Sequence, residues 1–170
     1  MWNEVIAAFK KELTAKMGQL QQHVESAVDA AIHSQSKMES RYDTYREDFS
    51  KEAAIADGYR TNYEIALREL GEIETKPVAD QTKVDIGAIV KLHYQNGHEA
   101  NFFLIRESAA GLEAEVDEVT YTMLSTEARL GEMLHGLSVG NAISLNGHTI
   151  TIAEIHYKEQ DDVQETTDSA

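Results

Sequence analysis

Acidic side chains gather in one polar segment of the chain, residues 34–48. Glu39 and Asp43 lie four positions apart, so a helical turn would bring their carboxylates onto one face. A group of carboxylates could hold a metal ion or contact a basic protein surface, and it could equally be a solvated loop. Two arginines and two further acids lie close by in the sequence: Arg41, Arg46, Glu47 and Asp48.

The overall charge limits which partners the chain can bind. The 170 residues include 15 Lys and Arg against 30 Asp and Glu, which gives a net charge of −15. Direct binding to a nucleic acid depends mainly on basic residues that neutralise phosphates. We therefore expect no direct DNA binding, whereas a basic protein surface remains a possible partner.

Other chemistries have little support in the sequence. The chain contains no Cys, which removes disulfides and thiolate catalysis. Its 7 histidines are scattered and form no helical pair of the zinc-binding type. No nucleophile elbow or Gly-rich phosphate loop is present. We expect no stable metal site and no active site of the protein's own.

The N-terminal segment has acidic and basic residues within an amphipathic pattern, instead of a basic cap followed by a continuous apolar run, and so does not resemble a signal peptide. No apolar run approaches the length that spans a bilayer. We expect a cytoplasmic protein without a membrane partner.

Two amphipathic patterns flank the acidic segment and predict the elements that position it. Apolar residues recur at steps of three and four from Ile6 to Ala31 and again from Phe49 to Ile73. The patterns predict an antiparallel helical hairpin over residues 1–75, with its reversal at residues 34–48. Each arm would be a rod about 40 Å long. Because such a thin rod has no core of its own, its apolar stripes must close as a coiled coil or pair with other chains.

A polar linker at residues 76–83 contains the only proline, Pro77, and separates the hairpin from a second domain at residues 84–157. Two Asn-Gly pairs, at 96–97 and 146–147, predict β-hairpins with two-residue turns. Residues 158–170 resemble a disordered acidic tail. The strands of the hairpins are expected at residues 89–94, 100–106, 142–145 and 148–155.

Between these hairpins, residues 118–124 could form a further strand, and residues 126–134 predict a short helix. Ser125 or Thr126 could cap its start, and Gly136 would end it. The predicted fold class is therefore α+β, with an antiparallel sheet packed on a short helix.

The order of these elements and one motif resemble the Gre family of bacterial transcript-cleavage factors. That family carries the segment Ser-Pro-Leu-Gly-x-Ala-Leu-Leu-Gly-x-x-Val-Gly-Asp, followed by a last strand similar to residues 150–155. This chain departs from it at Arg129, where proline is usual, and at Asn141, where aspartate is usual. The residues that carry the resemblance are Leu130, Gly131, Leu134, Gly136, Val139 and Gly140.

The resemblance implies a C-terminal domain with an FKBP-like (FK506-binding-protein-like) fold, which docks on bacterial RNA polymerase through that segment. It also implies that the hairpin enters the secondary channel of the polymerase. There the acidic tip would help to hold Mg²⁺ so that the polymerase cleaves its own backtracked RNA. The protein would then be no enzyme, would bind no stable cofactor, and would contact RNA only indirectly.

The tip departs from the family pattern at one position. Gre factors carry Asp-Leu-Ser-Glu-Asn-Ala-Glu-Tyr there, with two acids three positions apart. If Glu39 takes the place of the glutamate, Ser36 stands where the family has aspartate. Asp43 could complete a displaced pair with Glu39. Two functions fit: stimulation of transcript cleavage, and regulation of polymerase through the same channel without cleavage.

Two readings from other classes remain open. An isomerase or chaperone could use the FKBP-like domain, although such pockets are lined by aromatics and this domain offers mainly four of them. A structural coiled-coil protein could dimerise through the hairpin stripes. The four aromatics are Tyr94, Phe102, Phe103 and Tyr121.

Overall fold

A computed structural model describes the chain except for residues 35–38, 77, 79, 107–110 and 160–170. Within the two long helices, it does not describe the side chains of residues 27–50, 52 and 53. Most of the predicted acidic tail therefore lies outside the described residues. Among the residues that are described, no helix is both long and apolar enough to cross a bilayer.

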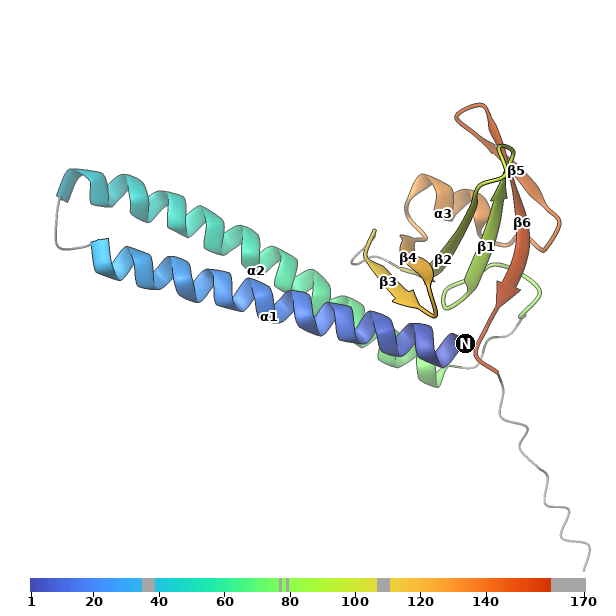
Figure 1. Cartoon of the computed structure of the whole chain (residues 1–170), viewed down its shortest axis with the longest axis horizontal. Helices are drawn as coiled ribbons and strands as arrows, with labels where there is room; N and C mark the ends of the chain where they lie inside the picture. The colour runs from blue at the N-terminus through green and yellow to red at the C-terminus, as the bar shows by residue number, and fades with distance from the viewer. Residues whose placement is uncertain (35–38, 77, 79, 107–110, 160–170) are drawn as a thin grey trace, which may run out of the picture.

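Two long helices, α1 (Trp2–Ser34) and α2 (Glu39–Thr75), run side by side in opposite directions and project from the sheet (Figure 1). The predicted reversal at residues 34–48 was too long, because α2 already begins at Glu39. Residues 39–48 are helical although the apolar stripe is interrupted there. Polar residues such as Glu and Arg have helix propensities close to those of apolar ones, so losing the stripe does not end a helix.

The second part of the chain is a six-stranded sheet in the order β3-β4-β2-β1-β6-β5. All neighbouring strands are antiparallel except β2 and β4, which are parallel, so the sheet is mixed and the prediction of an antiparallel sheet was wrong. The elements are β1 (Ile89–Tyr94), β2 (Glu99–Ile105), β3 (Glu113–Val116), β4 (Val119–Ser125), α3 (Arg129–Leu134), β5 (Ala142–Leu145) and β6 (His148–His156).

Strand β3 was not predicted, and it explains the parallel pair. The chain turns from β3 into β4 at Asp117 and Glu118, which have φ of 50° and 65°. Both residues occupy the left-handed region. Aspartate tolerates it but glutamate does not favour it, so the pair lacks the glycine that usually marks such a turn. Because β3 reverses the chain once more, β4 runs alongside β2 in the same direction.

Both predicted β-hairpins are confirmed by antiparallel pairing of β1 with β2 and of β5 with β6. The second has the expected two-residue turn, with φ of 53° at Asn146 and 78° at Gly147. The first is longer. Tyr94 N–H donates to His98 O at 2.8 Å, which leaves residues 95–97 as a three-residue loop, and within that loop only Gly97 has a positive φ, of 86°.

The short helix α3 begins at Arg129, three residues later than predicted. Its N-cap is Ala128, which supplies no side-chain cap, so the proposed caps at Ser125 and Thr126 were wrong. The Ser125 hydroxyl instead donates to Arg106 O at 2.7 Å and joins the loop to the end of β2. Gly136, with φ of 80°, directly follows the last turn, as expected.

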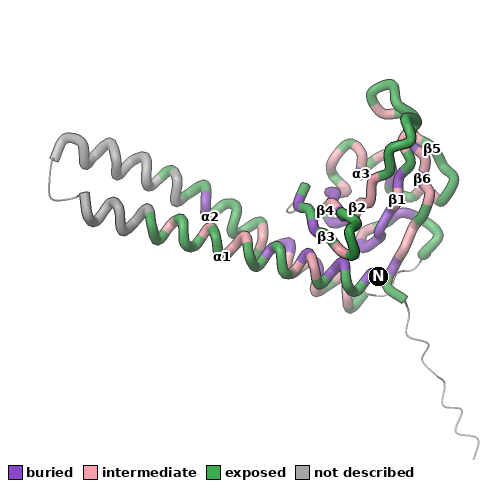
Figure 2. The backbone as a smooth tube through the Cα atoms, in the orientation of Figure 1, coloured by how far each residue is buried: buried purple, intermediate pink, exposed green. Residues whose placement is uncertain are grey.

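The root of the hairpin shares a core with one face of the sheet, which we call the hairpin–sheet core. The apolar stripes were expected to close on each other or on another chain. Near the root they pack on each other and are also buried against β-strands (Figure 2). The Phe9 and Phe103 rings lie 5.6 Å apart between centroids, and Trp2 Nε1–H donates to Gly87 O at 2.8 Å. This core includes Trp2, Val5, Ile6, Phe9, Leu13, Ala66, Leu70, Ile89, Phe103, Ile105 and Met123.

A second core lies on the other face of the sheet, beneath α3. Leu134 of α3 is fully buried there with Leu92 and Leu104. A β-bulge in β6 offsets Ala153, because Leu92 pairs with Ile152 while Lys91 pairs with Glu154. The bulge lets Ile150, Ile152 and Ile155 all contribute to one core, although their spacing is two and then three residues.

Tyr157 closes this second core after β6, and it provides a pH-dependent test of the packing. Its hydroxyl donates to Lys83 O, and burial raises its pKa to about 12 from the ordinary 10.0. The fold favours the neutral phenol. The contribution of this group to the free energy of unfolding is therefore complete below pH 10.0 and is lost as the pH rises towards about 12. Tyr157→Phe should lower stability by about 1 kcal/mol near neutral pH and reduce the alkaline loss. Urea unfolding at several pH values measures both effects, and the exposed Tyr59→Phe is the matched control.

Candidate functional site

The acids singled out by sequence lie in the first three turns of α2, at the end of the hairpin away from the sheet (Figure 1). Glu39 begins the helix, and Asp43 follows about one turn later. On an α-helix, residues four apart lie on the same face, so the backbone places Glu39, Asp43 and Glu47 along one side. Arg41, Arg46 and Asp48 lie in the same turns. The side chains of all six lie outside the described residues, as does Ser36.

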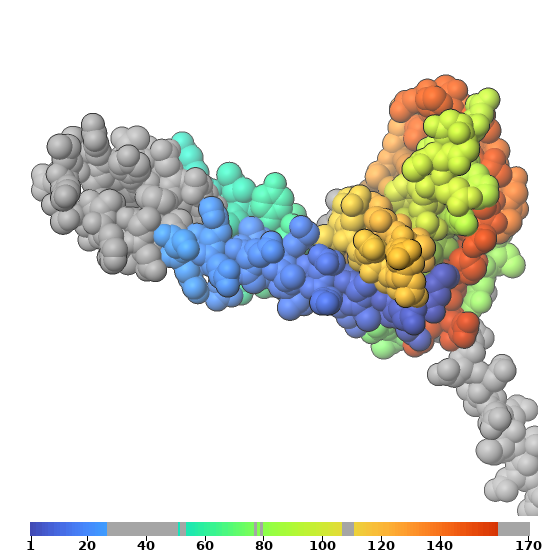
Figure 3. All heavy atoms as spheres, viewed as in Figure 1, coloured from blue at the N-terminus to red at the C-terminus, as the bar shows by residue number. Residues whose placement is uncertain are grey.

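The helices set how far the tip lies from the sheet. Helix α1 has 33 residues and α2 has 37. At a rise of 1.5 Å per residue, α1 is about 50 Å long. The first turns of α1 pack against β3 (Figure 3), and the hairpin–sheet core fixes the root. The helices therefore hold the acidic tip at a fixed distance from any partner that binds the sheet.

Polar contacts at the root add to this orientation. Lys10 Nζ of α1 lies 2.7 Å from Glu74 Oε2 of α2. Glu69 of α2 accepts a hydrogen bond of 3.0 Å from the backbone N–H of Arg106, at the end of β2. Lys158, beyond β6, donates to Glu74 O at 3.0 Å. These partly exposed contacts contribute little energy each, but together they link α1 to α2, and α2 to the end of the sheet where β2 and β6 finish.

The segment predicted to dock on a partner has mainly a packing role in this fold. Gly131 is buried, and a Cβ there would lie 2.0 Å from the carbonyl oxygen of Ser125. Leu134 is fully buried, and Leu130 is half-buried in the second core. Gly136 and Gly140 are exposed and have φ of 80° and 88°. Docking through this segment would rely on its exposed residues, which include Arg129, Glu132, His135 and Val139.

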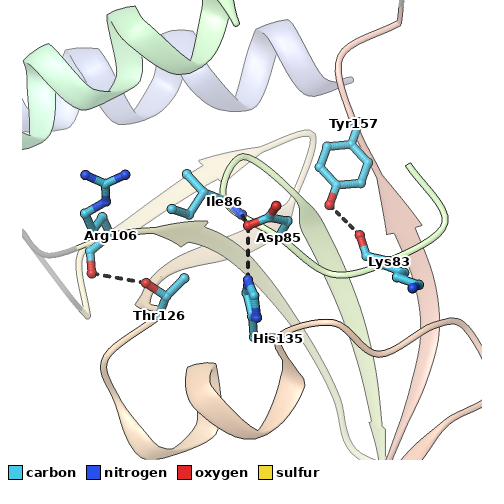
Figure 4. A network of polar contacts seen from close by, with 7 residues as sticks. All are labelled: Lys83, Asp85, Ile86, Arg106, Thr126, His135 and Tyr157. Carbon is cyan, nitrogen blue, oxygen red and sulfur yellow. Dashed lines mark hydrogen bonds and ion pairs between the residues drawn. The ribbon is translucent and has the colours of Figure 1, made fainter. Parts of the chain in front are cut away.

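A polar network joins α3 to the loop before β1 and the end of β2 (Figure 4). His135 Nε2 lies 3.2 Å from Asp85 Oδ1, and the same oxygen accepts a 2.7 Å bond from Ile86 N–H. The carbonyl of Arg106 accepts a bond from the Thr126 hydroxyl at 3.4 Å. Sequence reasoning missed this network, because its members are far apart in the chain and no local pattern connects them.

A cavity of about 410 Å³ lies between this network and the last turns of α2. Its described lining includes Ile73 and Ile86, with Lys76, Asp85 and Arg106 among the charged groups. No Ser, Thr, Cys or His is among the described residues that line it, so it does not pair a hydroxyl or thiol nucleophile with a histidine base. In the described part of the chain, no group of three or more His, Asp or Glu is arranged to hold a metal ion.

The four aromatics considered for an isomerase pocket do not meet in one place. Phe103 and Tyr121 belong to the hairpin–sheet core, whereas Tyr94 and Phe102 pack on the opposite face of the sheet. Adjacent residues of a strand point to opposite faces, so Phe102 and Phe103 cannot line the same pocket. The aromatic wall that an isomerase needs is therefore not assembled by these residues.

The fold and the placement of its acids define a two-part protein, a long helical arm rooted in a mixed six-stranded sheet. Neither the comparison with protein-family models nor that with curated proteins gives a match. Among solved structures, the chain is similar to the crystal structure of GreA factor homolog 1 (Gfh1) of Thermus thermophilus. A second similar structure is titled as that of the transcription factor Gfh1.

Both similarities have 14% sequence identity and a TM-score of 0.36. They cover 88% of this chain and 95% and 94% of the two solved chains. Identity and structural similarity this low do not carry a function from one protein to another. The function proposed below therefore rests on the residues and geometry of this chain.

Proposed function

We propose that this protein is a transcription factor that binds bacterial RNA polymerase and inserts its hairpin into the secondary channel. The observation that carries the proposal is the arm itself, with its root buried in the sheet and its acids at the opposite end. A pair of helices is about 20 Å across, narrow enough to enter a channel that a globular domain cannot. Such a factor acts in the cytoplasm.

Within the complex, Glu39 and Asp43 would supply oxygen ligands to a Mg²⁺ ion shared with the polymerase. Phosphoryl transfer at two-metal sites needs a second ion close to the reacting phosphate, and carboxylates are suitable ligands for it. The polymerase would provide the remaining ligands and catalyse the attack of water on backtracked RNA. The protein itself would be no enzyme, would hold no stable cofactor, and would contact RNA only within the complex.

One observation favours a second candidate, a regulator that enters the channel without promoting cleavage. Ser36 occupies the position of one of the two acids in the family that the sequence resembles. The remaining pair, Glu39 and Asp43, has a spacing of four instead of three. A tip with this change could still occupy the channel and alter polymerase activity while holding Mg²⁺ poorly.

The test uses purified bacterial RNA polymerase stalled in a backtracked complex. With the full-length protein, the RNA should shorten from its 3′ end. The double variant Glu39→Ala, Asp43→Ala should lower the cleavage rate by about 10- to 100-fold, as is typical when the ligand environment of a metal is lost. Higher Mg²⁺ should recover part of the loss. The matched control Glu12→Ala, Asp57→Ala removes two exposed acids elsewhere on the hairpin and should leave the rate unchanged.

Three outcomes separate the candidates. Cleavage that depends on Glu39 and Asp43 supports the cleavage factor. Binding to polymerase without any shortening of the RNA supports the regulator. Failure to bind polymerase in a direct binding assay contradicts both.

A further inference from the structure

The two edges of the sheet differ in how they are protected. Strand β3 forms one edge; it is contacted by α1 and carries the exposed acids Glu113 and Glu115. Strand β5 forms the other edge with the sequence Ala-Ile-Ser-Leu, which has no charge and no proline. Soluble proteins usually guard sheet edges with charges, prolines or covering elements, because an open edge pairs readily with another strand. The β5 edge lacks the charge and the proline, and α3 contacts it less extensively than α1 contacts β3.

The β5 edge belongs to the longest uncharged stretch of the sequence. Residues 133–153 contain no Asp, Glu, Lys or Arg, although 26% of the chain is charged. The stretch includes Val139, whose side chain is 56% exposed, and the exposed residues Ala142 and Ser144. Protein interfaces are depleted of charge at their centres. In an acidic protein, another molecule with negative charge meets less electrostatic repulsion at this surface than elsewhere.

The backbone of β5 offers unused hydrogen-bonding groups at regular spacing. Ile143 pairs with Ile150 and Leu145 with His148, and Ile152 N–H donates to Asn141 O at 2.9 Å. In an antiparallel pair, alternate residues turn their N–H and C=O groups away from the partner strand. The groups of Ala142 and Ser144 therefore point to the open edge. Among the described residues, no backbone group bonds to them there.

We propose that this edge is a homodimer interface, in which the β5 strands of two copies pair antiparallel across a two-fold axis. Ile143 of each copy would lie at the axis, and Ala142 of one copy would exchange backbone hydrogen bonds with Ser144 of the other. A two-fold interface must be complementary to itself, and an antiparallel strand pair meets that requirement. Two six-stranded sheets would then form one continuous sheet.

Charge limits where a second copy can bind. Each chain carries a net charge of −15, so two copies repel wherever their acidic surfaces meet. The uncharged β5 edge is opposite the β3 edge against which α1 packs, and it lies on the side away from the hairpin (Figure 1). Pairing there keeps the two hairpins apart. Both arms remain free, so the dimer does not depend on the proposed polymerase function.

The mass of the full-length protein in solution tests the proposal. Light scattering or sedimentation over a dilution series should show a mass rising from 19.0 kDa towards twice that value. Ser144→Pro should hold the protein at 19.0 kDa, because it removes an outward N–H that the fold itself does not use. Ser144→Lys should act in the same direction by placing a charge at the edge. Thermal unfolding checks that both variants fold.

Thr149→Lys is the matched control for the lysine variant. Thr149 pairs with Ser144 from β6, so the substitution adds the same charge to the same sheet face one strand inside the edge. The Thr149→Lys variant should dimerise like the unchanged protein. Added salt should strengthen the dimer, because salt screens the repulsion between two acidic chains. The amide hydrogen of Ser144 should exchange more slowly as the protein concentration rises.

Several results would overturn the interface. The protein could stay at 19.0 kDa at every concentration, which would leave the edge to a different partner. Ser144→Pro and Ser144→Lys could dimerise unchanged. Added salt could abolish the dimer, which would indicate charged contacts. Finally, the dimer could be lost on substituting the exposed Ile55 and Tyr59 of α2 with serine, which would place it on the hairpin.

Discussion

Phe9→Ala is expected to lower the free energy of unfolding by about 3–5 kcal/mol, the usual loss when a large aromatic side chain is removed from a core. Phe9 is fully buried, and its ring contacts Phe103 across the junction of hairpin and sheet. The cavity would open where few other elements can collapse to fill it, because the hairpin approaches the sheet only at its root. Urea unfolding, followed by far-ultraviolet circular dichroism, measures the loss.

Tyr59→Ala is the matched control for Phe9→Ala. Tyr59 lies on the same hairpin, but its side chain is 53% exposed, so we expect a change within about 0.5 kcal/mol. Equal effects of the two variants would contradict the hairpin–sheet core. If the proposed polymerase function is correct, Phe9→Ala should also weaken the effect on stalled complexes below the unfolding temperature, because a loosened root no longer positions the tip.

Gly131→Ala should cost about 3 kcal/mol, at the upper end of the range for overpacked sites. The added methyl group would lie 2.0 Å from Ser125 O and 2.9 Å from Ser125 C, both of which are backbone atoms. No side chain can move aside, so α3 must shift away from the end of β4. Thermal unfolding of the purified variant gives the loss directly, and a lower soluble yield should accompany it.

Two other glycines provide the control for Gly131→Ala. Gly18 and Gly71 lie within the long helices with no atom within 4 Å of an added Cβ. Alanine should stabilise each by about 0.5–1 kcal/mol, because it restricts the unfolded chain and fits the helix. If Gly131→Ala also stabilised the protein, the close approach of α3 to Ser125 would be wrong.

The motif that resembles the Gre family contains Gly131 and several other residues that stabilise this fold. Gly131 allows a close approach, Gly136 and Gly140 take left-handed backbone conformations, and Leu134 fills the second core. Each of these residues has a structural role in this chain. The motif therefore indicates how the chain folds, while the proposed function depends on the tip.

Sequence periodicity predicted the helices and the two β-hairpins because their signals are local. An apolar stripe needs only one turn of spacing, and an Asn-Gly turn needs two residues. The same reasoning missed β3, since Glu118 adopts a turn conformation that its residue type does not favour. It also placed residues 39–48 in a loop, because an interrupted stripe was taken as an interrupted helix.

For the functional residues too, some features were predictable from the sequence and others were not. Sequence alone identified Glu39 and Asp43 by residue type and spacing, and the helical backbone of α2 supports their placement on one face. The open β5 edge could not be recognised in advance, although its lack of charge is visible in the sequence. A strand is at an edge only because of which other strands pair, and those pairs join residues far apart in the chain.

The sequence by itself determined the two long helices, the β-hairpins and the candidate acids, because each depends on neighbours within a few positions. Only the tertiary structure decided that the hairpin root is buried against the sheet, that β2 and β4 are parallel, and that β5 is left open. The physical reason is that strand pairing and core burial are set by contacts between distant segments. Many such arrangements are compatible with the same local pattern.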